Sequence, residues 1–173
     1  MSKLFILMGV SGAGKSTVAA ALAEHFGYRY LDADDFHSDS AKAHMAAGHP
    51  LTDDMRAPWI ERMCTHLRGR AARGEDCVLA FSGLKRHHRE PLRHCDMDTH
   101  FLFLDGNAET IAQRMSSREG HFMPPSLLDS QFNALERPGA DEPDVVPIDI
   151  RPPVRDVLER AYRAVRAIEG ANR

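Results

Sequence analysis

Short apolar runs alternate with stretches of helical periodicity along the chain, and this alternation is typical of an α/β protein. The apolar runs have the length of strands and lie at residues 4–8, 28–31, 77–81, 99–104 and 145–150. Helical patterns separate them, at residues 18–26, 36–47, 52–73, 87–94, 108–117, 126–135 and 154–168. Strands that alternate with helices favour a parallel sheet covered on both faces. We therefore expect a three-layer α/β/α fold with a five-stranded parallel sheet.

Turn and cap residues set the limits of these elements. Gly48 and Pro50 end one predicted helix, and Thr52 is the expected N-cap of the next. Pro147 indicates an edge position or an irregularity in the last strand, because proline donates no ladder hydrogen bond. Residues 118–125 break all periodicity, so we expect a mobile lid at about residues 117–127. The residues that repeat on one face of the longest predicted helix are Trp59, Ile60, Met63 and Leu67.

Composition limits the class of protein and its partners. The 173 residues are 43% hydrophobic, which suffices for one core, so we expect a single domain over residues 1–173. The formal net charge of −3 provides no basic field for a nucleic-acid backbone and favours a small-molecule partner. No apolar segment approaches the ~20 residues that span a bilayer, so no membrane partner is expected.

The cysteines bear on the compartment. Cys64, Cys77 and Cys95 are odd in number and form no C-x-x-C pair, which argues against a disulfide framework and a structural zinc site. The apolar N-terminal run imitates a short secretory signal, but it leads into a lysine-bearing glycine loop. We therefore expect a soluble protein of the cytoplasm.

The stretch from Gly9 to Thr17 fits the phosphate-loop pattern Gly-x4-Gly-Lys-Ser/Thr without substitution. An apolar run precedes it and an alanine-rich helical stretch follows, which makes a chance match rare. In a strand–loop–helix arrangement, backbone N–H groups and the helix N-terminus attract phosphate. Lys15 is expected to reach the outer phosphates of ATP, and Ser16 a Mg²⁺ ion. The predicted nucleotide-binding residues of the loop are Gly9, Val10, Ser11, Gly12, Ala13, Gly14, Lys15, Ser16 and Thr17.

Polar residues recur where predicted strands end, which is the edge at which open α/β sheets bind ligands. Asp32 and Asp34 follow the second strand, and Lys85 follows the third. If the chain is extended there, Asp32 and Asp34 point to the same side, so that one faces magnesium-bound water and the other an acceptor hydroxyl. A solvated acidic turn is the alternative.

Cations near the same edge suit the transfer of a phosphoryl group. Arg114 and Arg118 lie four residues apart, so on a helix they share a face just before the lid, positioned to clamp the ATP phosphates. Four further cations exceed what ATP requires: Arg56, Lys85, Arg86 and Arg89. Guanidinium groups bind carboxylates through two hydrogen bonds. An anionic acceptor would use this excess. Ordinary solvated surface is the alternative for both sets.

Ten histidines raise the question of a metal site, but the chain has no H-E-x-x-H pattern. His87 and His88 are adjacent, so their side chains are expected to diverge on a helix or a strand. Most histidines are therefore expected at the surface. His37 and His121 remain candidates because His37 lies beside the aspartates and His121 lies in the lid.

These motifs together resemble the gluconate kinase family of small P-loop sugar-acid kinases, whose fold is similar to that of shikimate and nucleoside monophosphate kinases. The resemblance covers almost the whole chain. Many NTPases share the glycine loop, whereas the Pro-Leu-Thr-Asp-Asp-x-Arg-x-Pro-Trp and Gly-His-Phe segments are specific to this family. The matching stretches are residues 8–17, 32–37, 48–59, 82–89, 118–123 and 131–138.

The resemblance implies a P-loop kinase fold that transfers the ATP γ-phosphate to the 6-hydroxyl of D-gluconate with the help of Mg²⁺. It gives Asp34 the role of base for the acceptor hydroxyl and places Asp32 near the metal with Ser16. Lys15 and Arg118 complete the expected catalytic set. Family members are often homodimers. The expected sugar-acid contacts are Asp34, His37, Arg56, Lys85, Arg89 and His121.

The chain departs from the family pattern on the acceptor side. The family usually has an alanine where this chain has Gly83 and a tyrosine where it has His88; other departures are Ser38, Ala41 and His44. The identity of the acid therefore stays open. One alternative is a kinase for shikimate or another sugar acid, and an alternative of a different class is a nucleotide-binding regulatory module without catalysis.

Overall fold

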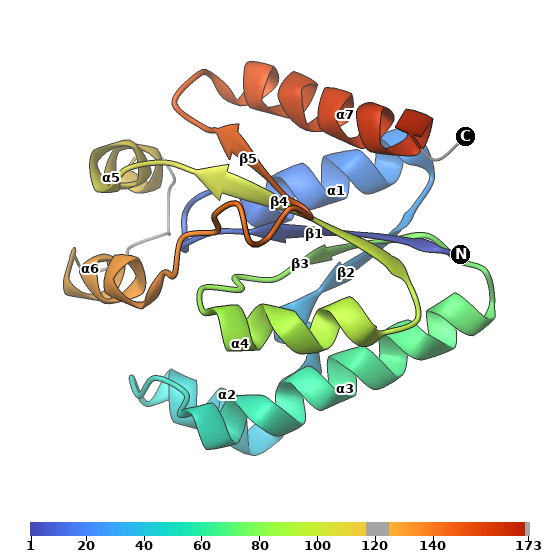
Figure 1. The fold of residues 1–173 in the computed structure, drawn as a ribbon. Coiled ribbons are helices and arrows are strands. Elements are labelled where there is room, and N and C mark those ends of the chain that lie inside the picture. Colours follow the sequence, from blue (N-terminus) through green and yellow to red (C-terminus); the bar gives the residue numbers. More distant parts are fainter. Residues whose placement is uncertain (117–124, 172–173) are drawn as a thin grey trace.

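The computed structural model describes residues 1–116 and 125–171 and contains a five-stranded parallel sheet (Figure 1). The strand order is β2-β3-β1-β4-β5, and every pairing is parallel. The sheet expected from the sequence is thereby confirmed. The strands are β1 (Lys3–Met8), β2 (Arg29–Asp32), β3 (Cys77–Ala80), β4 (Asp98–Asp105) and β5 (Val145–Asp149).

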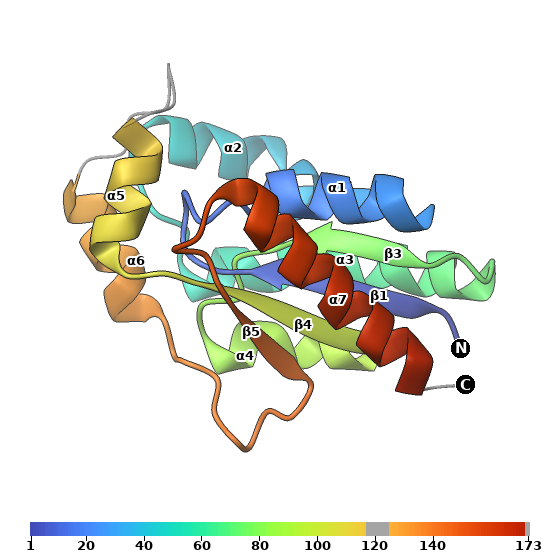
Figure 2. The ribbon, with the colours of Figure 1, turned by 90° about the horizontal axis from the view of Figure 1, so that it is seen from above.

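Helices cover both faces of the sheet and give the three expected layers (Figures 1 and 2). Helices α1 (Lys15–Phe26) and α7 (Val154–Ala171) lie on one face. Helix α3 (Asp53–Ala72) lies on the other with the short helices α4 (Arg86–Arg89) and η2 (Glu90–His94). The remaining helices are η1 (Ala33–Phe36), α2 (Asp39–Ala46), α5 (Ala108–Ser116) and α6 (Pro125–Ala134), of which α5 and α6 lie beyond the carboxyl end of β4 (Figure 1).

The central strand β1 shows how one short apolar run builds two cores. Phe5 and Leu7 belong to the apolar cluster that includes residues of α1 and α7. Leu4, Ile6 and Met8 belong to the cluster that includes residues of α3 and η2. All five side chains are fully buried, each contributing roughly 1.5–3 kcal/mol on burial. The continuous apolar run is therefore explained by a strand with both faces covered.

Side-chain caps fix the starts of helices α2 and α3. Thr52 Oγ1 accepts a hydrogen bond from the Met55 amide at 3.3 Å, so the predicted start of α3 is confirmed. The helix expected over residues 36–47 is confirmed in part: α2 covers Asp39–Ala46, whereas Phe36 belongs to η1. His37 is extended and ends η1, and Ser38, also extended, starts α2 because its Oγ accepts a hydrogen bond from the Ala41 amide at 3.1 Å. The residues expected on the buried face of α3 are all buried: Trp59, Ile60, Met63 and Leu67.

The edge position predicted from Pro147 is confirmed, because β5 is the last strand of the sheet. The predicted lid lies largely outside the described residues, and only its final residues, from Pro125, belong to α6. Among the described helices, none has the length and apolar character needed to cross a membrane. Cys64, Cys77 and Cys95 are free thiols, and all of them are buried.

Candidate active site

The glycine loop connects the end of β1 to the start of α1. Gly9, Gly12 and Gly14 all have positive φ, a backbone conformation that residues with a Cβ atom rarely adopt. A Cβ on Gly12 would lie 2.7 Å from Met115 of α5, so that helix packs directly against the loop. Helix α1 begins at Lys15, and its N-terminus therefore lies at the loop, where it favours an anion.

Lys15 lies within this loop. Its Nζ donates hydrogen bonds of 3.0 Å to the carbonyl oxygens of Gly9 and Val10. Burial lowers the pKa of Lys15 to about 8, and the charges of Asp34 and Asp32 partly oppose that shift. The ammonium group is thus desolvated and close to two carboxylates. A desolvated cation of this kind is strongly attracted to a phosphate group.

Ser16 and Asp32 bring hard oxygen ligands together. Ser16 Oγ donates to Asp32 Oδ2 at 3.4 Å, and the Tyr30 hydroxyl donates to the same oxygen at 3.2 Å. The other carboxylate oxygen of Asp32 accepts from the Asp34 amide at 3.0 Å and thereby caps η1. A hydroxyl beside a carboxylate is the donor set that Mg²⁺ prefers in proteins, so the residues present fit the expected ion.

Asp34 and His37 lie together just after β2. The Asp34 side chain is 85% exposed, whereas that of His37 is 4% exposed, and Asp34 Oδ1 lies 3.7 Å from His37 Nε2. His37 stacks on Trp59 of α3 with ring centroids 4.2 Å apart, and Trp59 Nε1 donates to the carbonyl of Ala33. Burial lowers the pKa of His37, with Asp34 opposing the shift. His37 Nδ1 is a buried nitrogen without a hydrogen-bond partner in the described part of the chain.

Arg56 and Lys85 come from separate elements but lie near the same carboxylate. Arg56 is in the first turn of α3, and its Nη1 lies 3.5 Å from Asp53 Oδ1. Lys85 is the N-cap of α4, and its charge helps to lower the pKa of Asp53, a shift caused mainly by a hydrogen bond from His88. Tertiary packing therefore brings these two predicted cations to one region.

The expected acceptor contact of Arg89 is corrected by the structure. Its side chain is 0% exposed and forms an ion pair with Glu142, whose side chain is 4% exposed. Every guanidinium N–H has a protein acceptor: Glu142 Oε1 and Oε2, and the carbonyls of Gly83, Leu84 and Glu136. Arg89 has no donor left for a sugar acid. Its role is to tie the chain after β3 to the segment before β5.

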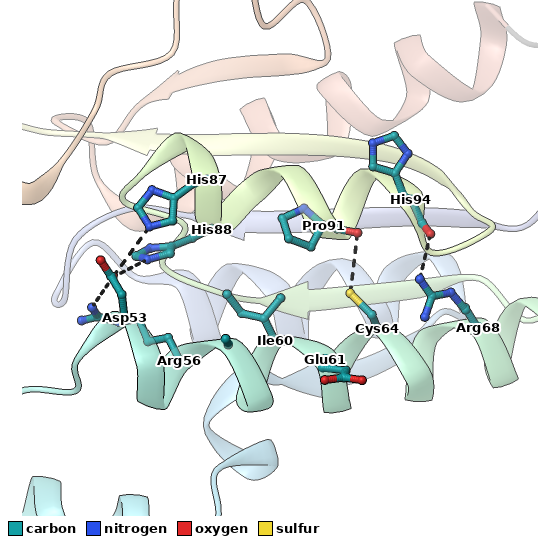
Figure 3. A pocket seen from close by; sticks show the side chains of 11 residues that line it. Asp53, Arg56, Ile60, Glu61, Cys64, Arg68, His87, His88, Pro91 and His94 are labelled. Carbon is teal, nitrogen blue, oxygen red and sulfur yellow. Dashed lines mark hydrogen bonds and ion pairs between the residues drawn. The ribbon is translucent and has the colours of Figure 1, made fainter.

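The expected divergence of His87 and His88 was also wrong (Figure 3). Both Nε2 atoms approach Asp53 Oδ1, at 3.7 Å from His87 and 3.3 Å from His88. The centroids of the two rings are 4.3 Å apart, and the His88 side chain is buried rather than at the surface. Adjacent residues on a four-residue helix converge here because α3 supplies a common partner, which a local pattern does not contain.

Of the two arginines predicted to clamp ATP, only Arg114 lies in the described part of the chain. Arg114 is in the last turn of α5, and its Nη2 donates to the carbonyl of Pro152, which lies just before α7. Arg118 and His121 lie outside the described residues. Their expected roles stay predictions.

Two polar residues beside the site were not singled out from the sequence. Gln131 of α6 accepts from the Ser11 amide at 2.6 Å and donates to Ser11 Oγ at 2.8 Å, so α6 contacts the glycine loop. A signal for Gln131 existed, since it begins one of the stretches that match the family. Glu142 lies in a turn-rich segment whose pattern gives no sign of burial. The hydrogen bond from Arg89 holds the pKa of Glu142 down at about 2.

Known proteins resemble this chain in both sequence and fold. A family model described as an AAA domain matches residues 4–138. Thermosensitive gluconokinase of Escherichia coli (strain K12) is 44% identical over 164 residues, covering 95% of this chain and 88% of that protein. The crystal structure of a gluconokinase from Sinorhizobium meliloti 1021 has a TM-score of 0.84 at 37% identity, covering 99% of this chain and 98% of that one. Shikimate kinase from Aquifex aeolicus vf5 has a TM-score of 0.59 at 14% identity, covering 96% and 98%, which shows the shared fold alone.

Proposed function

The chain belongs to the gluconokinase family of P-loop kinases, and we propose on this premise that it transfers the γ-phosphoryl group of ATP to the 6-hydroxyl of D-gluconate. One observation carries the proposal. A hydrogen-bonded series runs from Ser16 of the glycine loop through the carboxylate of Asp32 to the amide of Asp34. It joins the ATP side of the site to Asp34, whose exposed carboxylate we assign to the acceptor.

On the ATP side, the loop amides and Lys15 hold the phosphates. Lys15 exchanges its two carbonyl partners for phosphate oxygens, a stronger partner for a desolvated ammonium group. Ser16 and Asp32 would hold Mg²⁺, which, when bound, neutralises charge on the β- and γ-phosphates. Arg114 and Arg118 complete the proposed clamp, with Arg118 acting on the transferring group.

On the acceptor side, Asp34 orients the 6-hydroxyl and accepts its proton as the oxygen attacks phosphorus. His37 donates or accepts a hydrogen bond through Nδ1, which lacks a partner within the described protein. Arg56 and Lys85 attract the carboxylate of the sugar acid, and His121 adds a contact from the lid. Arg89 has no place in this set, because its donors are all used.

The competing functions differ in what stimulates ATP turnover. A kinase for shikimate or another sugar acid would use the same ATP side with a different acceptor. A regulatory module would bind ATP without needing Asp34 or the cations near Asp53. Homodimerisation and a cytoplasmic location are further proposals that rest on the family resemblance and on the cysteine content.

A coupled ADP-release assay tests the proposal. Purified protein with ATP and Mg²⁺ should release ADP fastest with D-gluconate in a panel that includes shikimate and other sugar acids. Lys15→Ala, purified in parallel, controls for a contaminating kinase and should be inactive. Equal rates with and without gluconate would refute the proposal, and tight ATP binding without any acceptor effect would favour the regulatory module.

A further inference from the structure

A cluster of nitrogen and oxygen ligands lies where the start of α3 meets α4 (Figure 3). It consists of one carboxylate oxygen from Asp53 and one ring nitrogen each from His87 and His88. These three atoms lie within 4.8 Å of one another. The set is distinct from Ser16 and Asp32, and none of its members has a role in the proposed phosphoryl transfer.

The spacing of these atoms suits a shared metal ion better than hydrogen bonds alone. Zinc binds imidazole nitrogen and carboxylate oxygen at about 2.0–2.2 Å, which places two ligands of a tetrahedral ion about 3.3–3.5 Å apart. His88 Nε2 is 3.3 Å from Asp53 Oδ1, and His87 Nε2 is 3.7 Å from it. The second distance is too long for a hydrogen bond and is that of an ion pair when the His87 ring is protonated, whereas one shared metal ion accounts for both approaches with neutral rings.

The surroundings are partly preorganised. The His88 side chain is only 10% exposed, so packing restricts its ring, whereas that of His87 is 59% exposed and is able to adjust by a small rotation. Beside the cluster, a cavity of about 470 Å³ lies between α3 and the α4–η2 segment. Its size leaves room for a water molecule as a fourth ligand.

We propose that Asp53, His87 and His88 form a site for a divalent first-row transition metal such as Zn²⁺. Two imidazoles and one carboxylate with an open fourth position are a ligand set that zinc uses. Imidazole ligands disfavour Mg²⁺ and Ca²⁺, which take oxygen ligands. The site is therefore chemically separate from the magnesium site of the ATP side. His88 occupies the position at which the related family usually has tyrosine.

A metal ion at this place would strengthen binding of the acceptor; this step rests on the proposed function. Asp53 Oδ1 also lies 3.5 Å from Nη1 of Arg56, a proposed acceptor contact. An ion bound by Asp53 withdraws that carboxylate from Arg56 and adds positive charge beside it. Both effects favour an anionic acceptor, so bound Zn²⁺ lowers the KM for gluconate and leaves the KM for ATP unchanged.

The primary test measures Zn²⁺ binding directly, with the full chain competing against a chromophoric chelator. The wild-type protein should bind one equivalent, and both His87→Asn and His88→Tyr should weaken the affinity at least about tenfold. His94→Asn is the matched control, because His94 lines the same cavity and pairs instead with Glu90. Unchanged affinity in His87→Asn, an exposed substitution that leaves packing intact, overturns the site even if His88→Tyr does not fold.

The second test compares gluconate kinetics at free Zn²⁺ buffered to about ten times its measured dissociation constant. Wild type should show a KM for gluconate lowered about two- to fivefold, with no change in His87→Asn. An equal response of both proteins overturns the coupling to the acceptor side. Absence of any gluconate-dependent turnover would refute the proposed function, while the chelator measurement still decides whether the metal site exists.

Discussion

The ATP side and the acceptor side of the proposed site are built in different ways. The ATP side comes from one continuous stretch, Gly9 to Thr17, completed by Asp32 at the end of β2. The acceptor side draws on η1, the first turn of α3 and the residue that caps α4. Local backbone geometry is enough to shape the first side, whereas the second depends on how distant elements pack.

This difference shows where specificity has room to change. The glycine loop is constrained by positive φ and by close contact with Met115, so few substitutions preserve it. The proposed acceptor side is held instead by a support whose donors are all used within the protein. Arg89 binds the carbonyls of Gly83 and Leu84, directly before Lys85, and anchors them to Glu142. Gly83 and His88, which depart from the family pattern, lie in and after this supported segment, and the amide of Gly9 in the glycine loop also donates to the carbonyl of Ser82 there at 3.1 Å.

The largest expected effect is that of a substitution at Asp34, which should impair catalysis but not ATP binding. We expect Asp34→Asn to lower kcat about 10²- to 10⁴-fold, because an amide cannot accept the hydroxyl proton. The ATP dissociation constant should change little, since the proposal assigns Asp34 to the acceptor and not to ATP. Single-turnover kinetics and calorimetric ATP titration measure the two quantities. Near-normal turnover would remove Asp34 from the role of base.

Arg89 tests whether the acceptor side depends on a buried support. Removing this cation leaves the buried Glu142 carboxylate without its main partner, so Arg89→Met should lower the free energy of unfolding by about 3–5 kcal/mol. Arg86 also contacts Glu142 but is half exposed, and Arg86→Met should cost less than about 1 kcal/mol. Urea denaturation compares the two variants. A similar loss in both would contradict the structural role given to Arg89.

Arg56 should behave in the opposite way from Arg89. It is partly exposed at the start of α3, so Arg56→Ala should leave unfolding nearly unchanged. Loss of a charged hydrogen-bond partner for the acid should raise the KM for gluconate about 10- to 100-fold, with the KM for ATP unaffected. Steady-state kinetics with each substrate varied in turn provides the measurement. Equal increases in both KM values would place Arg56 outside the acceptor side.

The smallest expected effect is the pH dependence of ATP binding. Lys15 has a pKa of about 8 without nucleotide, and a phosphate partner raises it, so binding takes up a proton above pH 8. ATP affinity should therefore be nearly flat below about pH 7, fall about twofold by pH 8, and approach a tenfold fall per pH unit above about pH 9. Lys15→Arg keeps its charge throughout and should show no such fall. The same slope in both proteins would assign the proton to another group.

The sequence determined the sheet, the glycine loop and the carboxylates at the end of β2, because their signals are local. An apolar run such as Leu4–Met8 is predictable as a buried strand, and the loop pattern specifies its own backbone. The N-cap at Thr52 and the edge position marked by Pro147 were predictable for the same reason. Each depends on the conformational preference of one residue or its neighbours.

Only the tertiary structure decided what the cations and histidines do. Arg89 and Arg56 look alike in sequence, yet Glu142 satisfies Arg89 from more than fifty residues away, while Arg56 stays partly exposed. His87 and His88 were expected to diverge, but Asp53 draws both rings to one oxygen. A charged or titratable side chain takes its role from the partner that folding brings to it. That partner lies on another element, so no local pattern contains it.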